Sequence, residues 1–225
     1  MANVKQFVVP VVDEGLILKY DQPGPRYTSY PTAPLFTDRF TAEDLRAEIS
    51  ATNAVPKPPP LSLYFHLPFC ESVCFFCGCN VTFTSDRSRP KSYTDVLLQE
   101  MDMVAPMLRQ DRRVVQLHWG GGTPTFFSPA QLESLFDAIT GRFRFADDAE
   151  LGIEIDPREL TPEHFDVLAR CRFNRLSMGV QDFDPEAQKA VNRIQPEELT
   201  RRTIQVARDK GFSSISVDLI YGLPY

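Results

Sequence analysis

The sequence predicts an α/β protein in which a parallel sheet curves into an open barrel, with helices outside and a polar interior. From Leu61 onward, segments typical of strands alternate with segments typical of helices, which favours parallel strands joined by crossover helices. Each strand has one apolar and one polar face, whereas an ordinary doubly wound sheet is apolar on both faces. A polar face is expected where a sheet curves around a ligand-holding interior.

Length and charge narrow the class of protein. The 225 residues, 43% of them hydrophobic, can bury a substantial core, and the net charge of −6 argues against general nucleic-acid binding. Residues 1–5 lack the basic start of a signal peptide, and no apolar run reaches the length of a transmembrane helix. We therefore expect a cytoplasmic protein without a membrane partner. The cytoplasm is a reducing compartment, which also suits clustered thiols.

Residues 1–55 show no strong periodicity and are expected to form an N-terminal arm. Within them, segment 23–31 combines turn-forming and aromatic residues, which is typical of a surface turn or of an arm laid over another surface. In the second case Arg26, Tyr27 and Tyr30 would cover or reach the functional site.

The strands and helices that follow are expected at definite positions. Five strands are expected at about 61–67, 114–119, 151–156, 175–181 and 214–220. Helix starts are expected at Thr41, Ser92, Ser128, Thr161, Asp184 and Pro196, where capping residues, prolines or acidic residues stand in the first turn, and Gly211 is the expected stop of the last helix. Alternation along the strands places Tyr64, Glu154, Gln181 and Asp218 on the inward polar face.

Four of the five cysteines lie within ten residues, directly after the first expected strand. The spacing Cys70-x3-Cys74-x2-Cys77 provides three thiolates that can close on one iron–sulfur cubane and leave its fourth iron without a protein ligand. A structural zinc site normally uses two separated Cys/His pairs, and the sequence has no second pair. A compact zinc knuckle and packed free cysteines remain the alternatives, and Cys79 is either a group beside the metal or a small residue in a tight loop.

The second expected strand runs into three consecutive glycines, 120–122, followed by Thr123. Glycines at this place let the backbone approach a ligand closely, but their spacing matches neither a Walker loop nor a dinucleotide-binding fingerprint. By themselves they indicate either a tight turn or a ligand contact.

The cysteine motif, preceded by Tyr-x-His-x-Pro-Phe, resembles that of radical S-adenosylmethionine enzymes, and its Cys-Gly-Cys-Asn ending is similar to the oxygen-independent coproporphyrinogen III oxidase (coproporphyrinogen dehydrogenase) family. The resemblance extends from Pro23 to Tyr225 through the segments His-Trp-Gly-Gly-Gly-Thr-Pro-Thr, Glu-Ile-Asp-Pro-Arg, Ser-Met-Gly-Val-Gln-Asp-Phe, Val-Asn-Arg-Ile-Gln and Asp-Leu-Ile-Tyr-Gly-Leu-Pro. With the cysteine motif these are six motifs in the family's order, which makes the resemblance specific.

This resemblance implies a set of site residues. A 4Fe-4S cluster would be bound by Cys70, Cys74 and Cys77. One S-adenosylmethionine would contact Tyr64, Phe76, Gly121 and Glu154, and a second would contact Gly122, Thr123, Gln181, Arg193 and Asp218. Arg26, Arg158 and Arg193 are candidates for binding propionate or methionine carboxylates, and Cys79 and Arg26 are candidates for a catalytic role.

The resemblance also implies the reaction and its partners. A one-electron donor such as flavodoxin or ferredoxin would reduce the cluster, and a 5′-deoxyadenosyl radical would remove hydrogen from a propionate side chain. Loss of carbon dioxide and one electron would leave a vinyl group, and two such rounds would convert coproporphyrinogen III to protoporphyrinogen IX in haem biosynthesis. The full-length protein is expected to be a monomer.

Two departures from the family set further expectations. The family's barrel has six βα units and a C-terminal domain, whereas residues 56–225 show five strands and the sequence stops in mid-motif at residues 222–225. We therefore expect an incomplete radical S-adenosylmethionine barrel in a truncated chain that is inactive by itself. The alternatives are a radical S-adenosylmethionine-like haem chaperone, a radical enzyme acting on another substrate, and a zinc-stabilised interaction module.

Overall fold

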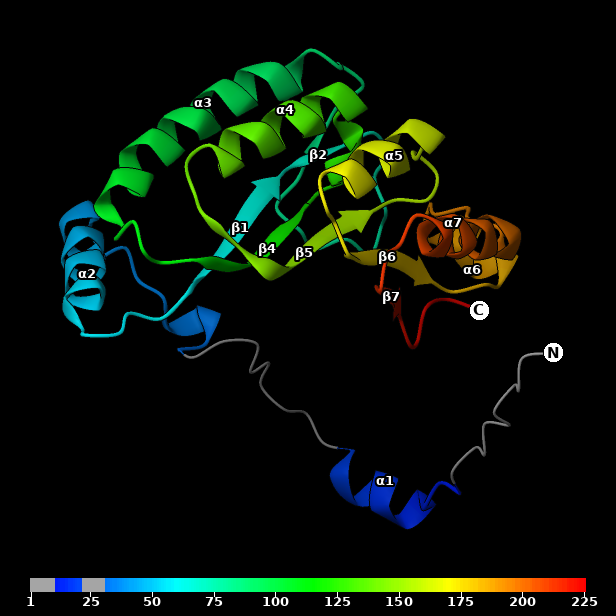
Figure 1. The fold of residues 1–225 in the computed structure, drawn as a ribbon. Coiled ribbons are helices and arrows are strands. Elements are labelled where there is room, and N and C mark those ends of the chain that lie inside the picture. The colour runs from blue at the N-terminus through cyan, green and yellow to red at the C-terminus, as the bar shows by residue number, and fades with distance from the viewer. Residues whose placement is uncertain (1–10, 22–30) are drawn as a thin grey trace. The chain divides into compact units, whose positions relative to one another are not determined.

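Figure 1 shows the computed structural model of the chain, which describes residues 11–21 and 31–225. Two compact units are distinguished, residues 1–45 and residues 46–225. Arg26, Tyr27 and Tyr30 lie outside the described residues, so the covering role of the N-terminal arm stays a prediction.

The first unit contains a helix that the sequence analysis did not predict, α1 (Glu14–Tyr20), and a 3₁₀ turn, η1 (Ala33–Leu35). Asp13 caps α1 by accepting a hydrogen bond from the backbone N–H of Leu16 at 3.2 Å. The helix buries no residue, and seven residues are too few to display the apolar stripe by which a helix is recognised in a sequence.

The helix expected after Thr41 is confirmed as α2 (Ala42–Ala54). The backbone N–H of Thr41 donates to the Asp44 carboxylate at 2.8 Å, and the Asp44 N–H donates to the Thr41 hydroxyl at 3.3 Å. This reciprocal pair satisfies backbone donors that the first turn of a helix leaves without partners.

Strands and helices alternate from β1 onward, as the sequence predicted. The elements are β1 (Leu61–Leu67), β2 (Phe69–Cys70), β3 (Thr82–Phe83), α3 (Arg89–Val104), η2 (Ala105–Met107), β4 (Val114–Gly121), η3 (Pro124–Phe126), α4 (Pro129–Thr140), β5 (Phe145–Ile155), α5 (Pro162–Arg170), β6 (Arg175–Gln181), α6 (Pro185–Ala190), α7 (Glu197–Asp209) and β7 (Ser214–Leu219). The five expected strands correspond to β1, β4, β5, β6 and β7. The short strands β2 and β3 form a separate two-stranded sheet that was not predicted.

The main sheet is parallel throughout and has the strand order β1-β4-β5-β6-β7. Consecutive βα units therefore add each new strand beside the last, which is the connectivity of a (β/α) barrel. Within the described residues β1 and β7 are the two edges, so the barrel is open, as predicted. Figure 1 shows α3, α4 and α5 side by side on one face of this sheet.

The helix-covered face of the sheet forms the hydrophobic core. Leu117 and Trp119 of β4 are fully buried, and they share one core cluster with Leu132 and Leu135 of α4. The Trp119 ring also packs against Phe173, with ring centroids 4.7 Å apart. Since full burial of a large apolar side chain contributes about 1.5–3 kcal/mol, this layer is what holds the helices on the sheet.

The opposite face of the sheet carries the polar residues that alternation predicted. The strand register places Tyr64 of β1 beside His118 of β4, and Glu154 of β5 beside Ser177 of β6. Because side chains of paired residues in a sheet point to the same face, the register gathers these polar groups on the side away from the core.

Most helix starts agree with the predicted signals, and one does not. Ser128 forms a full capping box with Gln131 at the start of α4, and Gly211, at φ 90°, follows the end of α7. The start predicted at Ser92 is wrong, because α3 begins at Arg89 with Pro90 in its first turn. Proline is well suited to that position, since a backbone N–H in the first turn has no helical partner and its absence costs no hydrogen bond.

None of the helices in residues 11–21 and 31–225 combines the length and the apolar character that crossing a membrane requires.

Candidate functional site

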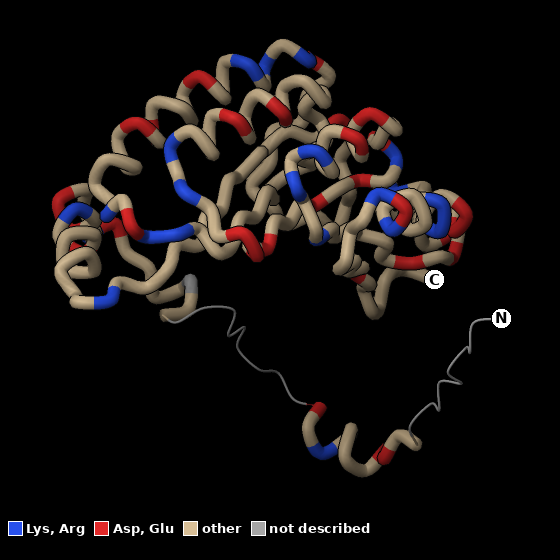
Figure 2. Tube along the Cα trace, viewed as in Figure 1, with Lys and Arg blue, Asp and Glu red and all other residues tan. Residues whose placement is uncertain are grey.

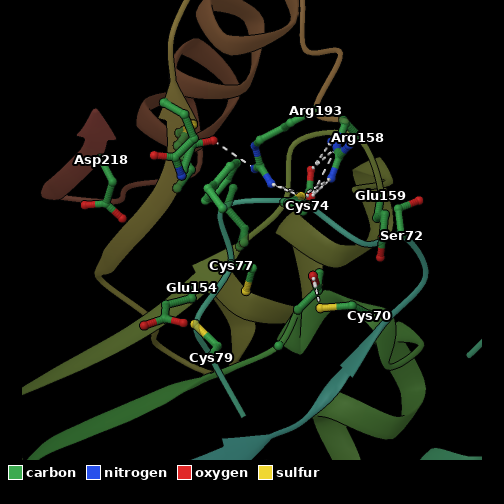
Figure 3. Close-up of a pocket in the computed structure, with 18 of the residues that line it drawn as sticks. Cys70, Ser72, Cys74, Cys77, Cys79, Glu154, Arg158, Glu159, Arg193 and Asp218 are labelled. Carbon is green, nitrogen blue, oxygen red and sulfur yellow. Dashed lines mark hydrogen bonds and ion pairs between the residues drawn. The ribbon is translucent and has the colours of Figure 1, made fainter. Parts of the chain in front are cut away.

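A cavity of about 150 Å³ opens on the polar face of the sheet, where the carboxyl ends of β4, β5 and β6 meet the cysteine loop (Figure 3). The predicted site residues that line it are Cys70, Cys74, Phe76, Cys77, Cys79, Gly122, Thr123, Glu154, Arg158, Gln181, Arg193 and Asp218. Ligand sites of parallel sheets lie at the carboxyl ends of the strands, because the loops that follow the strands converge there.

The cysteine loop, residues 70–79, is held by the turn that follows α6. The Phe75 N–H donates to the Val191 carbonyl at 3.0 Å, and the Asn192 side-chain amide donates to the Val73 carbonyl at 2.6 Å. Segments that are far apart in the sequence thus fix the position of Cys74.

The strand β2 and the glycine run hold the start of the same loop. The Gly122 N–H donates to the Leu67 carbonyl at 3.0 Å, and the Thr123 N–H donates to the Phe69 carbonyl at 2.8 Å. The Cys70 sulfur lies 3.4 Å from the Thr123 hydroxyl. The glycine run therefore packs directly against the chain that leads into the first cysteine.

The four thiols of the loop differ in exposure. Cys70 and Cys74 are half-buried, whereas Cys77 and Cys79 are exposed. Burial raises the pKa of the Cys70 thiol to about 11, and burial followed by the neighbouring Cys77 raises the pKa of the Cys79 thiol. Within residues 11–21 and 31–225, no group of three or more His, Cys, Asp or Glu side chains is gathered so as to hold a single metal ion.

Two arginines and one aspartate surround Cys74 inside the cavity. Asp156 accepts hydrogen bonds from Arg158 Nη2 at 2.6 Å and from Arg193 Nη1 at 3.1 Å. The Cys74 sulfur lies 3.6 Å from Arg158 Nη2 and 3.6 Å from Arg193 Nη1. Burial opposes ionisation of Asp156, but the hydrogen bonds from Arg158 and the charge of Arg193 hold its pKa below the ordinary value.

These surroundings fit a thiolate-bound cluster. An iron–sulfur cluster with thiolate ligands is anionic, and each of its thiolates binds a different iron, so the thiols need not meet at one point. Donors from two guanidinium groups complement that negative charge. Arg193 is 8% exposed, and its buried Nε has no hydrogen-bond partner among the described residues, so the wall of the cavity contains an unsatisfied donor.

Glu154 is fixed from two sides on the polar face. His118 Nε2 lies 3.3 Å from one carboxylate oxygen, and the Gly121 N–H donates to the other at 3.2 Å. Burial opposes ionisation of Glu154, but these two hydrogen bonds outweigh it and hold the pKa of the carboxyl below its ordinary value. Gly121 has φ 122°, a backbone conformation that residues other than glycine rarely adopt, so this contact requires glycine.

Two predicted residues do not line the cavity. Tyr64 is 58% exposed, its hydroxyl lies 3.0 Å from His66 Nδ1, and its ring stacks on His118 at a centroid distance of 6.0 Å. Gly121 donates its N–H to Glu154, which does line the cavity. Arg26 lies outside the described residues, so its predicted role is not tested.

Part of the cavity wall was not predicted from the sequence. The lining residues without a predicted role are Ser72, Phe83, Ile155, Asp156, Glu159, Ser177, Met178 and Gly179. Ser177 and Gly179 could have been found, because they alternate with apolar residues on the strand that ends in Gln181. Ser72 and Phe83 lie in or beside irregular segments, where no period indicates which way a side chain points.

Comparisons with known proteins agree with this architecture. A family model described as the radical SAM superfamily, SAM being S-adenosylmethionine, matches residues 64–225. Curated relatives include the oxygen-independent coproporphyrinogen III oxidases of Helicobacter pylori strain J99, 49% identical over 207 residues, and of Salmonella typhimurium strain LT2, 50% identical over 212 residues. These alignments cover 92% and 94% of this chain and 45% of each relative, so the chain spans about half the length of the curated relatives it matches.

A solved structure gives the same result. The coproporphyrinogen III oxidase of Escherichia coli, a radical SAM enzyme, matches with a TM-score of 0.84 and 46% sequence identity. The match covers 94% of this chain and 46% of that protein. The cavity, its cysteine loop and the strands that position them all fall within the region matched by the family model.

Proposed function

This chain belongs to the radical SAM superfamily, and on that premise we propose that its cavity binds a 4Fe-4S cluster through Cys70, Cys74 and Cys77. The observation that carries the proposal is the placement of these three thiols in one cavity beside the guanidinium groups of Arg158 and Arg193. Three thiolates leave one iron open to a ligand that is not a residue of the chain.

We propose that S-adenosylmethionine binds beside the cluster. Its first molecule is assigned to Tyr64, Phe76, Gly121 and Glu154, and a second to Gly122, Thr123, Gln181, Arg193 and Asp218. A carboxylate such as Glu154 can accept hydrogen bonds from ribose hydroxyls or an amino group, and the unpartnered Nε of Arg193 can donate to a carboxylate. Gln181 has φ 70°, a strained backbone conformation of the kind that clusters at ligand sites, which supports its assignment.

For the protein that carries this chain we propose the oxidative decarboxylation of two propionate side chains of coproporphyrinogen III, giving protoporphyrinogen IX. The names of the curated relatives and of the E. coli structure support this substrate. The bound cluster and S-adenosylmethionine would supply the radical chemistry that removes hydrogen from the propionate. The residues of the chain orient these groups and keep water from the reacting carbon.

The cellular setting is part of the proposal. The five described cysteines are all free thiols, which suits a reducing compartment, and we place the protein in the cytoplasm. A low-potential one-electron donor, a flavodoxin or a ferredoxin, would reduce the cluster. We propose that the complete protein acts as a monomer.

The test is anaerobic incubation of the protein that carries this chain, with iron and sulfide restored, with coproporphyrinogen III, S-adenosylmethionine and a reductant. Mass analysis of the porphyrins should show loss of two carboxyl groups. Cys74→Ser should abolish the reaction because it removes a proposed cluster ligand. Cys171→Ala is the matched control, since it removes a thiol that does not line the cavity.

Two results would overturn parts of the proposal. If S-adenosylmethionine is cleaved but the porphyrin is unchanged, the radical chemistry stands and the assignment of coproporphyrinogen III as the substrate is wrong. Haem binding without conversion of the porphyrinogen would assign the protein as a haem chaperone instead.

A further inference from the structure

Arg158 and Arg193 share the Asp156 carboxylate and each lies 3.6 Å from the Cys74 sulfur, but Arg158 contacts the carboxylate through two nitrogens and Arg193 through one. Arg158 directs Nε to Asp156 Oδ1 at 3.0 Å and Nη2 to Asp156 Oδ2 at 2.6 Å, and Nη2 also lies 3.6 Å from the Cys74 sulfur. Arg193 donates to the Gly179 carbonyl at 2.8 Å, and its buried Nε has no partner in the described chain. Arg158 is thus held by two bonds to Asp156, whereas Arg193 is divided between Asp156 and the Gly179 carbonyl (Figure 3).

The charges of this group do not cancel. Two guanidinium groups and one carboxylate leave a net positive charge against the Cys74 sulfur. The Asp156 side chain is 6% exposed and the Arg158 side chain 20% exposed, so solvent screens their charges far less than at the surface.

We propose that Arg158, held in place by Asp156, is a positioning residue that raises the reduction potential of the cluster bound through Cys74. This inference rests on the proposed function, because it needs a cluster at the three cysteines. Reduction adds one electron from an external donor to the cluster and no proton, so the cluster becomes more negative. A cation that donates a hydrogen bond to a ligand sulfur stabilises the reduced state more than the oxidised state.

The geometry separates this role from carboxylate binding, which the sequence suggested for Arg158 as well as for Arg193. The planar Arg158 guanidinium is fixed edge-on by Asp156, with Nε and Nη2 both directed to the carboxylate. We therefore assign the recognition of a methionine or propionate carboxylate to Arg193 and the tuning of the cluster to Arg158.

The test is a redox titration of the cluster-loaded protein, followed by the electron paramagnetic resonance signal of the reduced cluster. Arg158→Gln should lower the midpoint potential, so that at a fixed potential the ratio of reduced to oxidised cluster falls about tenfold, equivalent to about 59 mV for one electron. Arg158→Lys keeps the charge but loses the planar contact with Asp156, and its midpoint should lie between those of Arg158→Gln and the parent protein. Arg170→Gln is the matched control, because it removes the same charge from an exposed ion pair with Glu133 and should leave the potential unchanged.

Each outcome decides one claim. An unchanged midpoint in Arg158→Gln with full iron content would overturn the inference and leave the proposed function standing. Absence of bound iron in the parent protein after reconstitution would instead overturn the proposed function. A folded Arg158→Lys protein that holds no cluster would also overturn the inference, since a residue that only tunes the potential is not needed for cluster binding. An unaltered potential together with a raised KM for S-adenosylmethionine would assign Arg158 to carboxylate binding.

Discussion

Replacing Gly122 by alanine should destabilise the protein through one local contact. A methyl group at this position would lie 2.7 Å from the Phe69 carbonyl oxygen and 2.8 Å from the Pro68 carbonyl carbon and oxygen. These neighbours are backbone atoms, which cannot rotate away as the end of a side chain can. Gly122 itself does not have positive φ, so the close approach alone produces the effect.

The size of the effect follows from what must move. To admit the methyl group, residues 68–69 must shift away from the glycine run, which disrupts the hydrogen bonds from the Gly122 and Thr123 N–H groups. Two hydrogen bonds contribute about 2 kcal/mol, and overpacking adds about 1–3 kcal/mol. We expect a loss of about 3–5 kcal/mol, a large part of the roughly 5–15 kcal/mol by which a domain is usually stable.

Urea denaturation followed by circular dichroism measures this loss. With a slope of about 2 kcal/mol per molar urea, the midpoint should fall by about 2 M. Gly78→Ala, in the cysteine loop, is the matched control because a methyl group there meets nothing within 4 Å, and its effect should stay within about 0.5 kcal/mol. If Gly122→Ala unfolds at the same urea concentration as Gly78→Ala, the backbone contact does not constrain the loop and the reasoning is wrong.

Two further predictions concern buried titratable groups. Burial, followed by the charge of Asp156, raises the pKa of Glu159 above its ordinary value of 4.5. Between the unfolded-state pKa and the raised folded-state pKa, the folded state therefore binds more protons than the unfolded state. Stability should therefore decline through that window, and Glu159→Gln should flatten the decline in denaturation curves measured from pH 4 to pH 8; an equally steep decline in the variant would refute this. Burial raises the pKa of the Cys171 thiol to about 11, so brief iodoacetamide treatment of the native iron-free chain at pH 8 should label the exposed Cys77 and Cys79 and spare Cys171. Peptide mass analysis, with denatured chain as the fully labelled control, checks this, and labelling of Cys171 at the rate of Cys77 would contradict it.

The distribution of charge along the chain explains why the site was found by motif and not by composition. Figure 2 shows acidic and basic residues interspersed along the helices of residues 46–225. The charges that matter are instead a few side chains at strand ends, such as Glu154 and Asp156. Such placement follows from alternation within a strand and leaves the overall charge balance unaffected.

Much of this protein follows from the sequence alone. The apolar and polar alternation of the strands determined the sheet, its two faces and the inward position of Glu154 and Gln181, because a strand repeats every two residues. The spacing of Cys70, Cys74 and Cys77 likewise indicated the chemistry, since thiolates this close in sequence can reach one cluster.

Only the tertiary structure decided which groups surround those thiols. Cys74 and Arg193 are separated by 119 residues, yet the sulfur and the guanidinium lie 3.6 Å apart. The close approach of Gly122 to Phe69 and the pairing of Asp156 with Arg193 likewise join segments whose local sequence indicates no partner. Periodicity and spacing describe single elements, whereas the electrostatic surroundings of the site arise where loops from several strand ends meet.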